Sequence, residues 1–479
     1  MQIAFGSDGY RGIIGHRLTR EAIARIVLSV RSTLNELNAA DTGATIPIGF
    51  DTRFLAREQA NYAARLLTKL GYTPLVNPDP CPSPYLAFAV KHLGAPIGLQ
   101  FTASHNPPYY GGIKLKGAHG GSLYPEQADL VESLANYVDL AEVADVPFIS
   151  TDTSPKALEI DAAYKKALWQ AAGWDGDHET EILVDFMHGA TYQLYGGILA
   201  GAFNLNTELH TEPDPLFGGD KPEPKADRLN ELVQRVTYSG GQAVGLAFDG
   251  DGDRLAVVDE QGRLLAPHEI FCLLLEHLAQ HHQKCGVVVT TVSFSGLVER
   301  VASAHDCLVL DVPVGFKHVS RAMQEEKAIM GGEESGGTGF GHYLPERDAL
   351  LMALLLLHAR HLAGTTISEM VEQLYRTYGR PVFIRRDLAL AVDFSPEELK
   401  RNIRDLASLQ RLAGDDVTSL NHRDGMKLKT EAGWVLVRPS GTEPLVRVYA
   451  EGDSEQQANA YADAVTSQLT VNLADNPRV

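Results

Sequence analysis

Three aspartates alternate with glycines in the segment Asp249-Gly250-Asp251-Gly252-Asp253, directly after the apolar run AVGLAF. Glycine permits the tight backbone turns that bring alternating side chains to one point. Three carboxylates at this spacing suit Mg²⁺, which binds hard oxygen ligands and keeps other positions for water or phosphate. The segment is not an EF-hand, because it continues into LAVVDE without the Glu that such a loop carries at its twelfth position. The alternative is an acidic turn exposed to solvent.

A serine occupies a comparable place in the segment Thr102-Ala103-Ser104-His105-Asn106-Pro107, which follows the apolar run PIGLQF. A serine between small and polar residues after a strand is a candidate nucleophile. The segment lacks the G-x-S-x-G pattern of α/β-hydrolases, and taken alone it is equally a polar turn. Beside an acidic metal loop, however, a phosphorylated Ser104 would supply a fourth anionic ligand. Mg²⁺ would then stabilise charge on a transferring phosphoryl group.

Two further loops have polar side chains that fit a phosphorylated sugar. The segment Gly332-Glu333-Glu334-Ser335-Gly336-Gly337 offers carboxylates and a hydroxyl to sugar hydroxyls, although alone it could be a surface loop. The segment Arg438-Pro439-Ser440-Gly441-Thr442-Glu443-Pro444 combines an Arg, two hydroxyls and backbone N–H groups, which form a plausible phosphate cradle or a tight hairpin turn. Three basic residues elsewhere would add positive charge to such a site: Arg11, Lys114 and Lys317.

The elements needed to bring these loops together indicate an α/β fold. Apolar runs of strand length alternate with segments of helical periodicity, which is typical of βαβ units and a mostly parallel sheet. The predicted strands lie at 46–51, 96–102, 181–185, 243–248, 286–292 and 308–312, and the predicted helices at 55–70, 192–202, 296–303 and 316–326. Because ligands bind beyond the carboxyl ends of strands in open α/β sheets, the loops after these strands are where a site is expected.

The last part of the chain follows a different plan. Its predicted strands are 382–390, 426–430, 434–437 and 444–449, and its predicted helices are 396–406 and 454–469. Strands that are neighbours in sequence favour an antiparallel α+β module. We therefore expect three similar mixed α/β domains over residues 1–150, 151–255 and 256–370, and a C-terminal α+β domain over 371–479.

Composition narrows the possible partners and location. The chain has 479 residues and a formal net charge of -19, so we expect neither nucleic acid nor anionic membranes to bind it. The start MQIAFGSDGYRG lacks the features of a signal peptide, and the apolar run ALLMALLLLHARHLA is too short and too polar to span a bilayer. The four cysteines show no metal-binding spacing, and their apolar surroundings indicate reduced, buried thiols. These features predict a cytoplasmic protein.

With these loops in this order, the chain resembles the α-D-phosphohexomutase superfamily, which contains phosphoglucomutases, phosphomannomutases and phosphoglucosamine mutases. The likeness rests on TASHNP, DGDGDR, GEES and RPSGTEP, together with the opening FGSDGYRG, and covers nearly the whole chain. It implies four domains around one central cleft. It also implies an intramolecular phosphotransferase, in which phosphorylated Ser104 converts a hexose 1- or 6-phosphate into a bound 1,6-bisphosphate. That intermediate turns around and returns its other phosphate to the serine.

The resemblance also implies a role for each residue of the motifs. Mg²⁺ would be held by Ser104 in its phosphorylated form, Asp249, Asp251 and Asp253, with Arg254 beside this centre. Lys114 takes the position of a candidate general acid or base, for which burial or a nearby cation must lower its pKa. Arg11 and His105 would assist proton transfer or balance charge near Ser104. The residues implied to bind substrate are Glu333, Ser335, Lys317, Arg438, Ser440, Gly441 and Thr442.

Two departures from the family pattern leave the sugar open. Bacterial phosphomannomutases and phosphoglucosamine mutases often have His at the position of Gly337, and many members have Asn before the glycine of the segment that leads to Lys114, where this chain has Gly111-Gly112. By the resemblance, the sugar loop binds the hydroxyls at C3 and C4 of the hexose, whereas glucose and mannose differ at C2. We therefore expect dual or glucose-leaning specificity, with glucose 1,6-bisphosphate as activator and a monomer or homodimer as the assembly.

Other functions fit the same residues less well. A hexose-1,6-bisphosphate synthase would use the same phosphoserine with another donor, and a phosphoglucosamine mutase would differ only in the sugar. A non-catalytic phosphosugar-binding protein would not need Ser104, the three aspartates and Arg438 together. A haloacid-dehalogenase-type phosphatase would place a nucleophilic D-x-D after an early strand, and no such segment is visible.

Overall fold

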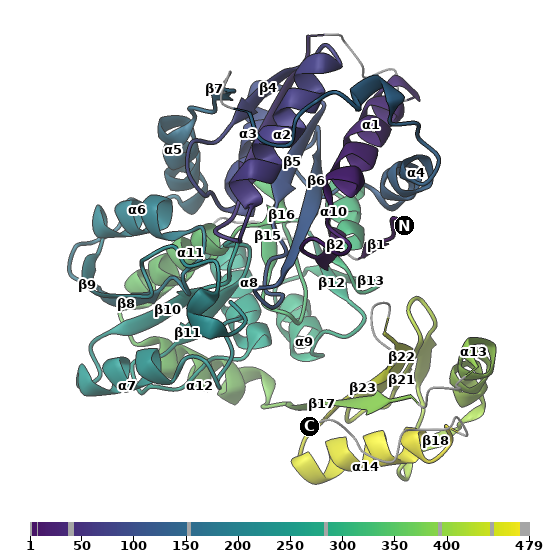
Figure 1. The fold of residues 1–479 in the computed structure, drawn as a ribbon. Coiled ribbons are helices and arrows are strands. Elements are labelled where there is room, and N and C mark those ends of the chain that lie inside the picture. Colours follow the sequence, from purple (N-terminus) through teal and green to yellow (C-terminus); the bar gives the residue numbers. More distant parts are fainter. Residues whose placement is uncertain are drawn as a thin grey trace.

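The computed structural model describes residues 2–6, 8–36, 43–150, 155–281, 286–390, 395–440 and 445–469 of the chain. Within these residues the chain forms four successive α/β units, here called domains I to IV, each built on its own sheet (Figure 1). Domains I to III pack together, while domain IV lies to one side and joins domain III through the connection from α12 to β17 (Ile367–Tyr378 and Val382–Ala389). This arrangement matches the predicted fold class.

Domain I is built on a mixed seven-stranded sheet. In spatial order its strands are β1 (Phe5–Gly6), β2 (Gly9–Ile13), β6 (Tyr110–Gly117), β5 (Ile97–Phe101), β3 (Thr45–Phe50), β4 (Thr73–Val76) and β7 (Lys156–Ala157). The strands from β5 to β7 run parallel, and the other pairs are antiparallel. Its helices are α1 (Arg20–Glu36), α2 (Ala56–Lys69), α3 (Ser83–Leu93) and α4 (Pro125–Ala135).

Domain II has a four-stranded sheet in which the central strands are parallel. Its strand order is β11 (Leu255–Val258), β10 (Val244–Phe248), β8 (Glu181–Asp185) and β9 (Asn204–Leu209), and its helices are α5 (Asp161–Ala172), α6 (Gly197–Ala200) and α7 (Asn230–Tyr238). Because β11 belongs to this sheet, domain II extends slightly beyond residue 255. The helix predicted over 192–202 is instead a π-helical turn followed by the short α6, since glycines at 196, 197 and 201 disfavour a continuous helix.

Domain III repeats the strand–helix alternation. Its strand order is β13 (Leu308–Val312), β12 (Val287–Thr291), β14 (Met330–Gly332), β15 (Thr338–Phe340) and β16 (Leu344–Arg347). Its helices are α8 (Pro267–His281), α9 (Leu297–Ala304), α10 (Phe316–Glu325), α11 (Ala349–Ala363) and α12. No single helix among the described residues has the length and hydropathy to cross a membrane, and the apolar α11 is a core helix, buried from Ala349 to Leu357.

Domain IV has the predicted antiparallel α+β plan. Its five-stranded sheet has the order β17, β23 (Leu445–Gly452), β22 (Trp434–Pro439), β21 (Met426–Lys429) and β20 (Ser419–Asn421), and every neighbouring pair is antiparallel. The remaining elements are α13 (Pro396–Asp405), α14 (Glu455–Thr466) and the small ribbon of β18 (Arg411–Leu412) and β19 (Asp415–Asp416).

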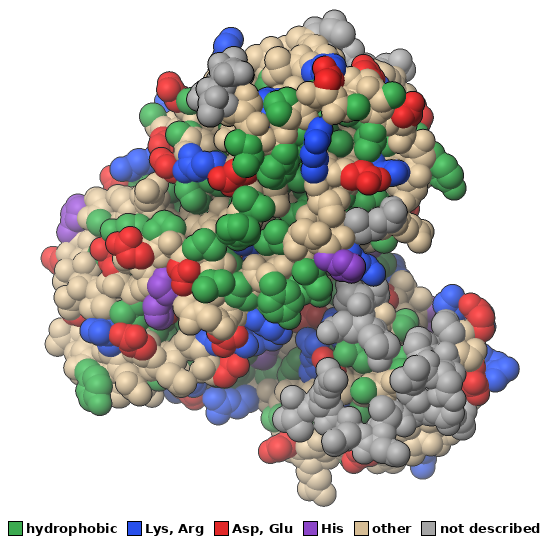
Figure 2. All heavy atoms as spheres, viewed as in Figure 1, with side chains coloured by type: hydrophobic (Ala, Val, Ile, Leu, Met, Phe, Trp, Pro, Cys, Tyr) green, Lys and Arg blue, Asp and Glu red, His purple; other side chains and the backbone are tan. Residues whose placement is uncertain are grey.

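The hydrophobic cores divide the molecule into a large body and a separate C-terminal domain. One buried cluster runs continuously from Tyr85 of domain I through Phe248 of domain II to Leu354 of domain III, whereas domain IV has a core of its own. The surface is hollowed between domain IV and the large body (Figure 2). Domains I to III therefore share part of their apolar burial, although most of domain I has a core of its own, and domain IV joins domain III through a smaller cluster.

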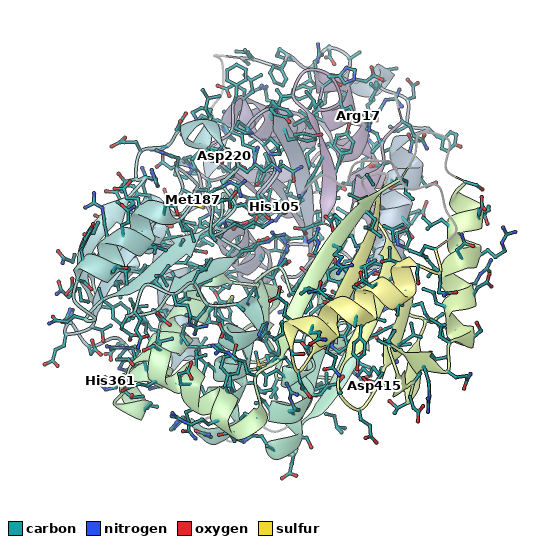
Figure 3. All side chains as sticks on the ribbon, turned by 90° about the horizontal axis from the view of Figure 1, so that it is seen from below. Arg17, His105, Met187, Asp220, His361 and Asp415 are labelled. Atoms are coloured by element: carbon teal, nitrogen blue, oxygen red, sulfur yellow. The ribbon has the colours of Figure 1, made fainter. Side chains whose placement is uncertain are left out.

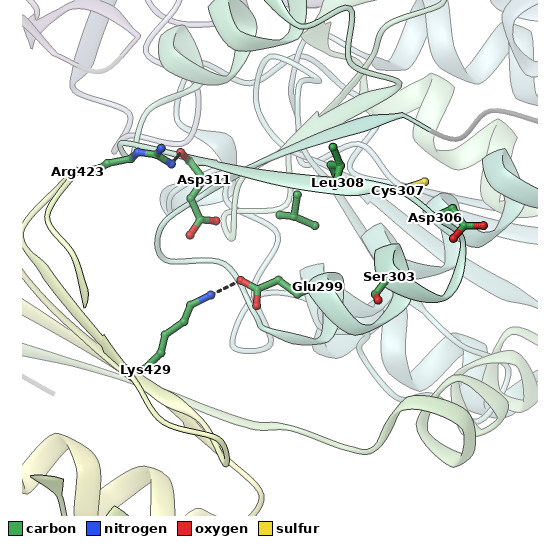
Figure 4. A pocket seen from close by; sticks show the side chains of 9 residues that line it. Glu299, Ser303, Asp306, Cys307, Leu308, Asp311, Arg423 and Lys429 are labelled. Atoms are coloured by element: carbon green, nitrogen blue, oxygen red, sulfur yellow. Dashed lines mark hydrogen bonds and ion pairs between the residues drawn. The ribbon is translucent and has the colours of Figure 1, made fainter. Parts of the chain in front are cut away.

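The contact between domains III and IV has an apolar part, in which Val292 of domain III is buried in one cluster with Trp434, Leu436 and Tyr449 of domain IV, and a polar part. Lys429 pairs with Glu299, and the Arg423 guanidinium donates to the carbonyl oxygen of Asp311 (Figure 4). The backbone N–H of Val314 donates to Asp424 Oδ2 at 3.0 Å. The first two of these pairs border a cavity of about 620 Å³. Domain IV is thus positioned by a small apolar cluster together with ion pairs and hydrogen bonds.

We predict that Leu354→Ala lowers the free energy of unfolding by about 2–5 kcal/mol, because it leaves a cavity where the cores of three domains meet. The matched control is Leu308→Ala, since Leu308 is 72% exposed and should change stability by less than about 0.5 kcal/mol. Urea unfolding followed by circular dichroism measures both. Equal small effects for the two variants would contradict a continuous core.

Candidate active site

The predicted functional loops follow the carboxyl ends of central strands in three domains. Ser104 lies after β5, Asp249 after β10, and Glu333 directly after β14. His105, next to the serine, lies near the middle of the molecule in the view from below (Figure 3). The strand-end rule thus correctly indicated which loops meet, although they come from three different sheets.

Ser104 is held in a strained and buried position beside the acidic loop. Its φ of 50° lies in the left-handed region, which non-glycine residues rarely adopt. Its backbone N–H donates to Thr102 Oγ1 at 2.8 Å, and its hydroxyl donates to Asp249 Oδ2 at 3.0 Å. Nδ1 of His105 lies 3.4 Å from the same hydroxyl. The serine oxygen is therefore directed at the carboxylate loop of domain II.

The three aspartates of that loop converge as the glycine spacing predicted. Oxygens of Asp249, Asp251 and Asp253 lie within 4.8 Å of one another, and all three residues are buried. A Cβ at Gly250 would lie 2.9 Å from the carbonyl oxygen of Ser104, so the missing side chain allows the two loops to touch. The backbone N–H groups of Asp253 and Arg254 donate to Asp249 Oδ1 and fix its carboxylate.

The electrostatics of the loop fit a divalent cation. Burial, together with the charges of Asp253 and Asp251, holds the pKa of Asp249 well above its ordinary value. The oxygens Asp251 Oδ1 and Asp253 Oδ1 are buried and have no hydrogen-bond partner among the described residues. Unsatisfied carboxylate oxygens facing one another are destabilising unless a cation binds them. The donor set is the hard-oxygen set that Mg²⁺ prefers.

Lys114 is the cation that the chain itself supplies to this loop. Its ammonium lies 2.8 Å from Asp8 Oδ2, 2.8 Å from Asp251 Oδ2 and 2.7 Å from Asp253 Oδ2. Burial alone would lower its pKa, but the three carboxylates outweigh burial and raise the pKa above its ordinary value. This direction is opposite to the lowered pKa that the acid/base prediction requires, and it follows from the crowding of carboxylates around one ammonium.

The other predicted catalytic residues surround the serine loop. Arg11 Nη1 donates to Asn106 Oδ1 at 2.6 Å, in the loop of Ser104. Arg254 lies 3.8 Å from Glu223 Oε1. Burial, and then the positive charges of Arg254 and Arg11, hold the pKa of His105 well below its ordinary value. The imidazole beside Ser104 is therefore neutral, and the positive charge of the site lies on its arginines and Lys114.

The sugar loop of domain III brings a buried carboxylate to the same place. Glu333 is buried, and its Oε2 lies 3.5 Å from Nη1 of Arg347. Glu334 accepts hydrogen bonds from Thr291 and Ser293, whereas Ser335 is exposed. Lys317 borders a small pocket of about 20 Å³ between domains I and III, which Asp8 also lines. The loop therefore presents both a buried and an exposed polar side chain.

The predicted phosphate loop lies on domain IV and is only partly described. Arg438 Nε donates to Asp424 Oδ2 at 3.0 Å, and the backbone N–H of Ser440 donates to the carbonyl oxygen of Leu445 at 2.9 Å. Gly441 and Thr442 lie outside the described residues. Burial, and then the charge of Glu334 in the sugar loop, raise the pKa of Tyr449 in β23 of the same domain.

Arg53 is a site residue that the sequence reasoning missed. Its guanidinium donates to four backbone carbonyls of the serine loop, those of Ser104, Asn106, Pro107 and Tyr110, at 2.6–2.9 Å. Its Nε pairs with Asp51 Oδ2 at 3.1 Å, and the ring of Phe217 from domain II packs against it. Asp51-Thr52-Arg53 directly follows β3, so the strand-end rule that found the other loops could have found it.

Asp8 and Arg347 were also missed. Arg347 Nη2 lies 2.6 Å from Asp8 Oδ2 and 2.9 Å from Asp253 Oδ2. Burial alone would raise the pKa of Asp8, but Arg347 and Lys114 outweigh it and hold the pKa well below its ordinary value. Asp8 lies in the opening segment FGSDGYRG, from which only Arg11 was singled out, and Arg347 lies far in sequence from Asp8 and Asp253, so no local pattern pointed to it.

Comparisons with known proteins match almost the whole chain. Family models described as phosphoglucomutase/phosphomannomutase, alpha/beta/alpha domains I, II and III match residues 2–142, 162–262 and 266–378, and the model of the C-terminal domain matches 396–468. A phosphoglucosamine mutase from Levilactobacillus brevis is 30% identical over 478 residues, which covers 98% of this chain and 99% of that protein. A phosphoglucomutase/phosphomannomutase from Thermococcus kodakarensis is 26% identical over 474 residues, with 96% of each chain covered.

A solved structure has the same fold over its full length. The crystal structure of a protein from Thermus thermophilus, provisionally assigned as a phosphomannomutase, superimposes with a TM-score of 0.79 at 29% sequence identity. The match covers 98% of this chain and 99% of that chain.

We predict that Arg53→Lys destabilises the serine loop. A lysine has three donors on a single atom and cannot reach four carbonyls, and each buried carbonyl left without a donor costs about 1–3 kcal/mol. Turnover should fall about tenfold or more, because the nucleophile loses its fixed position. The control is Arg57→Lys, which changes a half-exposed arginine on α2. Urea unfolding and steady-state assays measure both variants, and equal behaviour of the two would contradict the role of Arg53.

Proposed function

The chain belongs to the phosphoglucomutase/phosphomannomutase family, and from that premise we propose that it interconverts hexose 1-phosphates and hexose 6-phosphates through phosphorylated Ser104. The proposed substrates are glucose and mannose phosphates, and the proposed intermediate is a bound hexose 1,6-bisphosphate. The observation that carries the proposal is the 3.0 Å contact between the Ser104 hydroxyl and Asp249, one of three buried aspartates suited to Mg²⁺.

The residues around Ser104 support phosphoryl transfer more than any other group transfer. Phosphoryl transfer depends mainly on positioning and on stabilising charge, with little demand for covalent chemistry beyond the nucleophile. When bound by Asp249, Asp251 and Asp253, Mg²⁺ supplies charge neutralisation on the phosphoryl oxygens. Arg53 holds the serine loop, and Arg11 is tied to the same loop through Asn106. The nucleophile is thus fixed in place before substrate arrives.

Proton transfer at the sugar hydroxyl is assigned to Lys114, with His105 and Arg11 beside it. The carboxylates of Asp8, Asp251 and Asp253 raise the pKa of Lys114. A cation held by Asp249, Asp251 and Asp253 would compensate part of that charge and so would lower the pKa of Lys114. His105 is neutral because burial and neighbouring cations lower its pKa, so its imidazole can accept a hydrogen bond beside the serine but is a weak base.

The two ends of the substrate are assigned to domains III and IV. Glu333 and Ser335 would bind sugar hydroxyls, and Lys317 would add positive charge at the border of domains I and III. Arg438, Ser440, Gly441 and Thr442 would hold the phosphate that is not being transferred. Tyr449 of domain IV interacts with Glu334, which supports placing this phosphate site opposite the sugar loop.

A glucosamine phosphate is the second candidate substrate, because the L. brevis relative is named a phosphoglucosamine mutase. A coupled assay with glucose, mannose and glucosamine 1-phosphates distinguishes these sugars. Analysis of the products separates a mutase from a hexose-1,6-bisphosphate synthase, since a mutase releases little free bisphosphate. Accumulation of bisphosphate with a separate phosphoryl donor would assign the synthase reaction instead.

We predict that Ser104→Ala abolishes turnover with glucose 1-phosphate in the presence of glucose 1,6-bisphosphate, because the phosphoryl carrier is removed. The control is Ser335→Ala, which removes an exposed hydroxyl from the sugar loop and should affect mainly KM. Intact mass spectrometry should detect phosphate on the wild-type chain after treatment with the bisphosphate and none on Ser104→Ala. Near wild-type turnover of Ser104→Ala would falsify the phosphoserine mechanism.

We also predict that KM for the sugar phosphate rises as the pH falls from 8 to 6, because burial raises the pKa of Glu333 to about 7 and protonation removes hydrogen-bond acceptors for sugar hydroxyls. The pKa of Glu333 in the folded state exceeds its ordinary value of 4.5, so protonation of this carboxyl stabilises the folded state. That stabilisation is lost as the pH rises from 4.5 to 7.

Glu333→Gln is the reference for both effects, since glutamine does not titrate. Titration of the substrate phosphate affects both enzymes equally, so it cancels in the ratio of the wild-type KM to the variant KM. Unfolding midpoints across the same pH range measure stability. A constant ratio between pH 6 and 8 would show that Glu333 does not act through its charge.

A further inference from the structure

Gly337 lies at the end of the sugar loop, directly before β15, and its surroundings explain the lack of a side chain. A Cβ built at Gly337 would lie 2.3 Å from Cδ and 2.8 Å from Cγ of Arg347. The backbone φ of Gly337 is outside the left-handed region, so its conformation would accept any residue. Gly337 is therefore needed because the stem of Arg347 fills the space of a side chain there.

The guanidinium at the end of that stem contacts functional loops of three domains. Its Nη2 lies 2.6 Å from Asp8 Oδ2 in domain I and 2.9 Å from Asp253 Oδ2 in domain II. Its Nη1 lies 3.5 Å from Glu333 Oε2 in the sugar loop of domain III. Arg347 thus bridges an aspartate suited to Mg²⁺ and a carboxylate suited to sugar hydroxyls.

Three features fix the orientation of this side chain. Its Nε lies 3.4 Å from Glu346 Oε1, the ring of Phe316 lies under the guanidinium at 4.9 Å, and the residue is only 3% exposed. A planar guanidinium carries five N–H donors in a fixed geometry, which a lysine ammonium cannot reproduce. The position of Asp253 relative to Glu333 therefore depends on one rigid group.

We propose that Arg347 is a positioning residue and that Gly337 and Arg347 form a matched pair, which sets the distance between the metal-binding loop and the sugar-binding loop. The proposal rests on the proposed function, in that these loops bind Mg²⁺ and the sugar. A side chain at position 337 displaces the stem of Arg347, and the guanidinium then loses its contacts with Asp253 and Glu333. Neither member of the pair can change alone without moving both loops.

The test is a double-mutant cycle with Gly337→Ala and Arg347→Ala. Gly337→Ala should lower kcat/KM about tenfold or more and should weaken Mg²⁺ binding, measured by isothermal titration calorimetry with Mg²⁺ alone. In the Arg347→Ala background, where Cγ and Cδ are gone, the same substitution should change both quantities by less than about twofold. The control is Gly197→Ala, since a Cβ at Gly197 meets no atom within 4 Å.

If Arg347→Ala does not fold, Arg347→Met takes its place. Methionine retains an apolar stem of similar length without the charge. In this background Gly337→Ala should still lower stability, since the stem remains, but should change kcat/KM and Mg²⁺ affinity by less than about twofold, since the guanidinium contacts are already absent. The proposal is overturned if Gly337→Ala behaves like Gly197→Ala, if its cost is the same with and without the Arg347 stem, or if it lowers stability while Mg²⁺ affinity and KM stay unchanged.

Failure of the proposed function is a separate outcome. If the wild-type chain turns over no sugar phosphate, the proposed mutase activity is wrong. The Mg²⁺ titrations and unfolding midpoints of the four cycle variants still report whether Gly337 and Arg347 are coupled.

Discussion

The crowding of buried carboxylates beside Ser104 is the constraint on which the rest of the structure depends. Asp249, Asp251 and Asp253 are all buried within one loop, and Asp8 joins them from domain I. Buried like charges are costly unless cations and hydrogen bonds compensate them. Lys114 of domain I and Arg347 of domain III supply positive charge, since each forms an ion pair with Asp253. The aspartates of domain II are thus compensated by cations from domains I and III. The site is therefore stabilised only when these three domains are assembled.

The division of the hydrophobic cores follows from this requirement. Domains I to III share a continuous apolar cluster, which suits a site whose charges must keep fixed distances. Domain IV has its own core and meets domain III through a small apolar cluster around Trp434 and through pairs such as Lys429 with Glu299, beside a cavity of about 620 Å³ (Figure 4). Interfaces of this mixed kind permit relative domain motion more readily than large apolar ones. The rigid part of the molecule therefore holds the nucleophile and the metal-binding loop, and the less tightly joined part carries the phosphate loop.

Sequence patterns predicted what is local and missed what is distant. The glycine spacing around Asp251 and the strand before Ser104 are local features, and the structure brings both loops together as expected. Arg347 gains its role from carboxylates far along the chain, so no spacing reveals it, whereas Arg53 lies just after β3, where the strand-end rule could have found it. The direction of the Lys114 pKa shift was unpredictable for the same reason, since it depends on how many carboxylates converge on one ammonium. The helix predicted over 192–202 is present over 192–200, but its first turn is π-helical and its α-helical part is short, since glycines at 196, 197 and 201 disfavour a regular α-helix.

Charge balance also links the state of Ser104 to the cations around it. In the unmodified protein the serine hydroxyl donates a hydrogen bond to Asp249, so one of the buried carboxylate oxygens has a hydrogen-bond donor. A phosphoserine has no proton to donate and adds about -1.5 to -2 of charge at neutral pH. His105 cannot compensate this charge, because burial and the nearby arginines keep its imidazole neutral. Lys114 is already shared among three carboxylates. A phosphorylated Ser104 therefore requires an additional cation at the aspartate loop, which couples binding of a divalent metal to phosphorylation of the nucleophile.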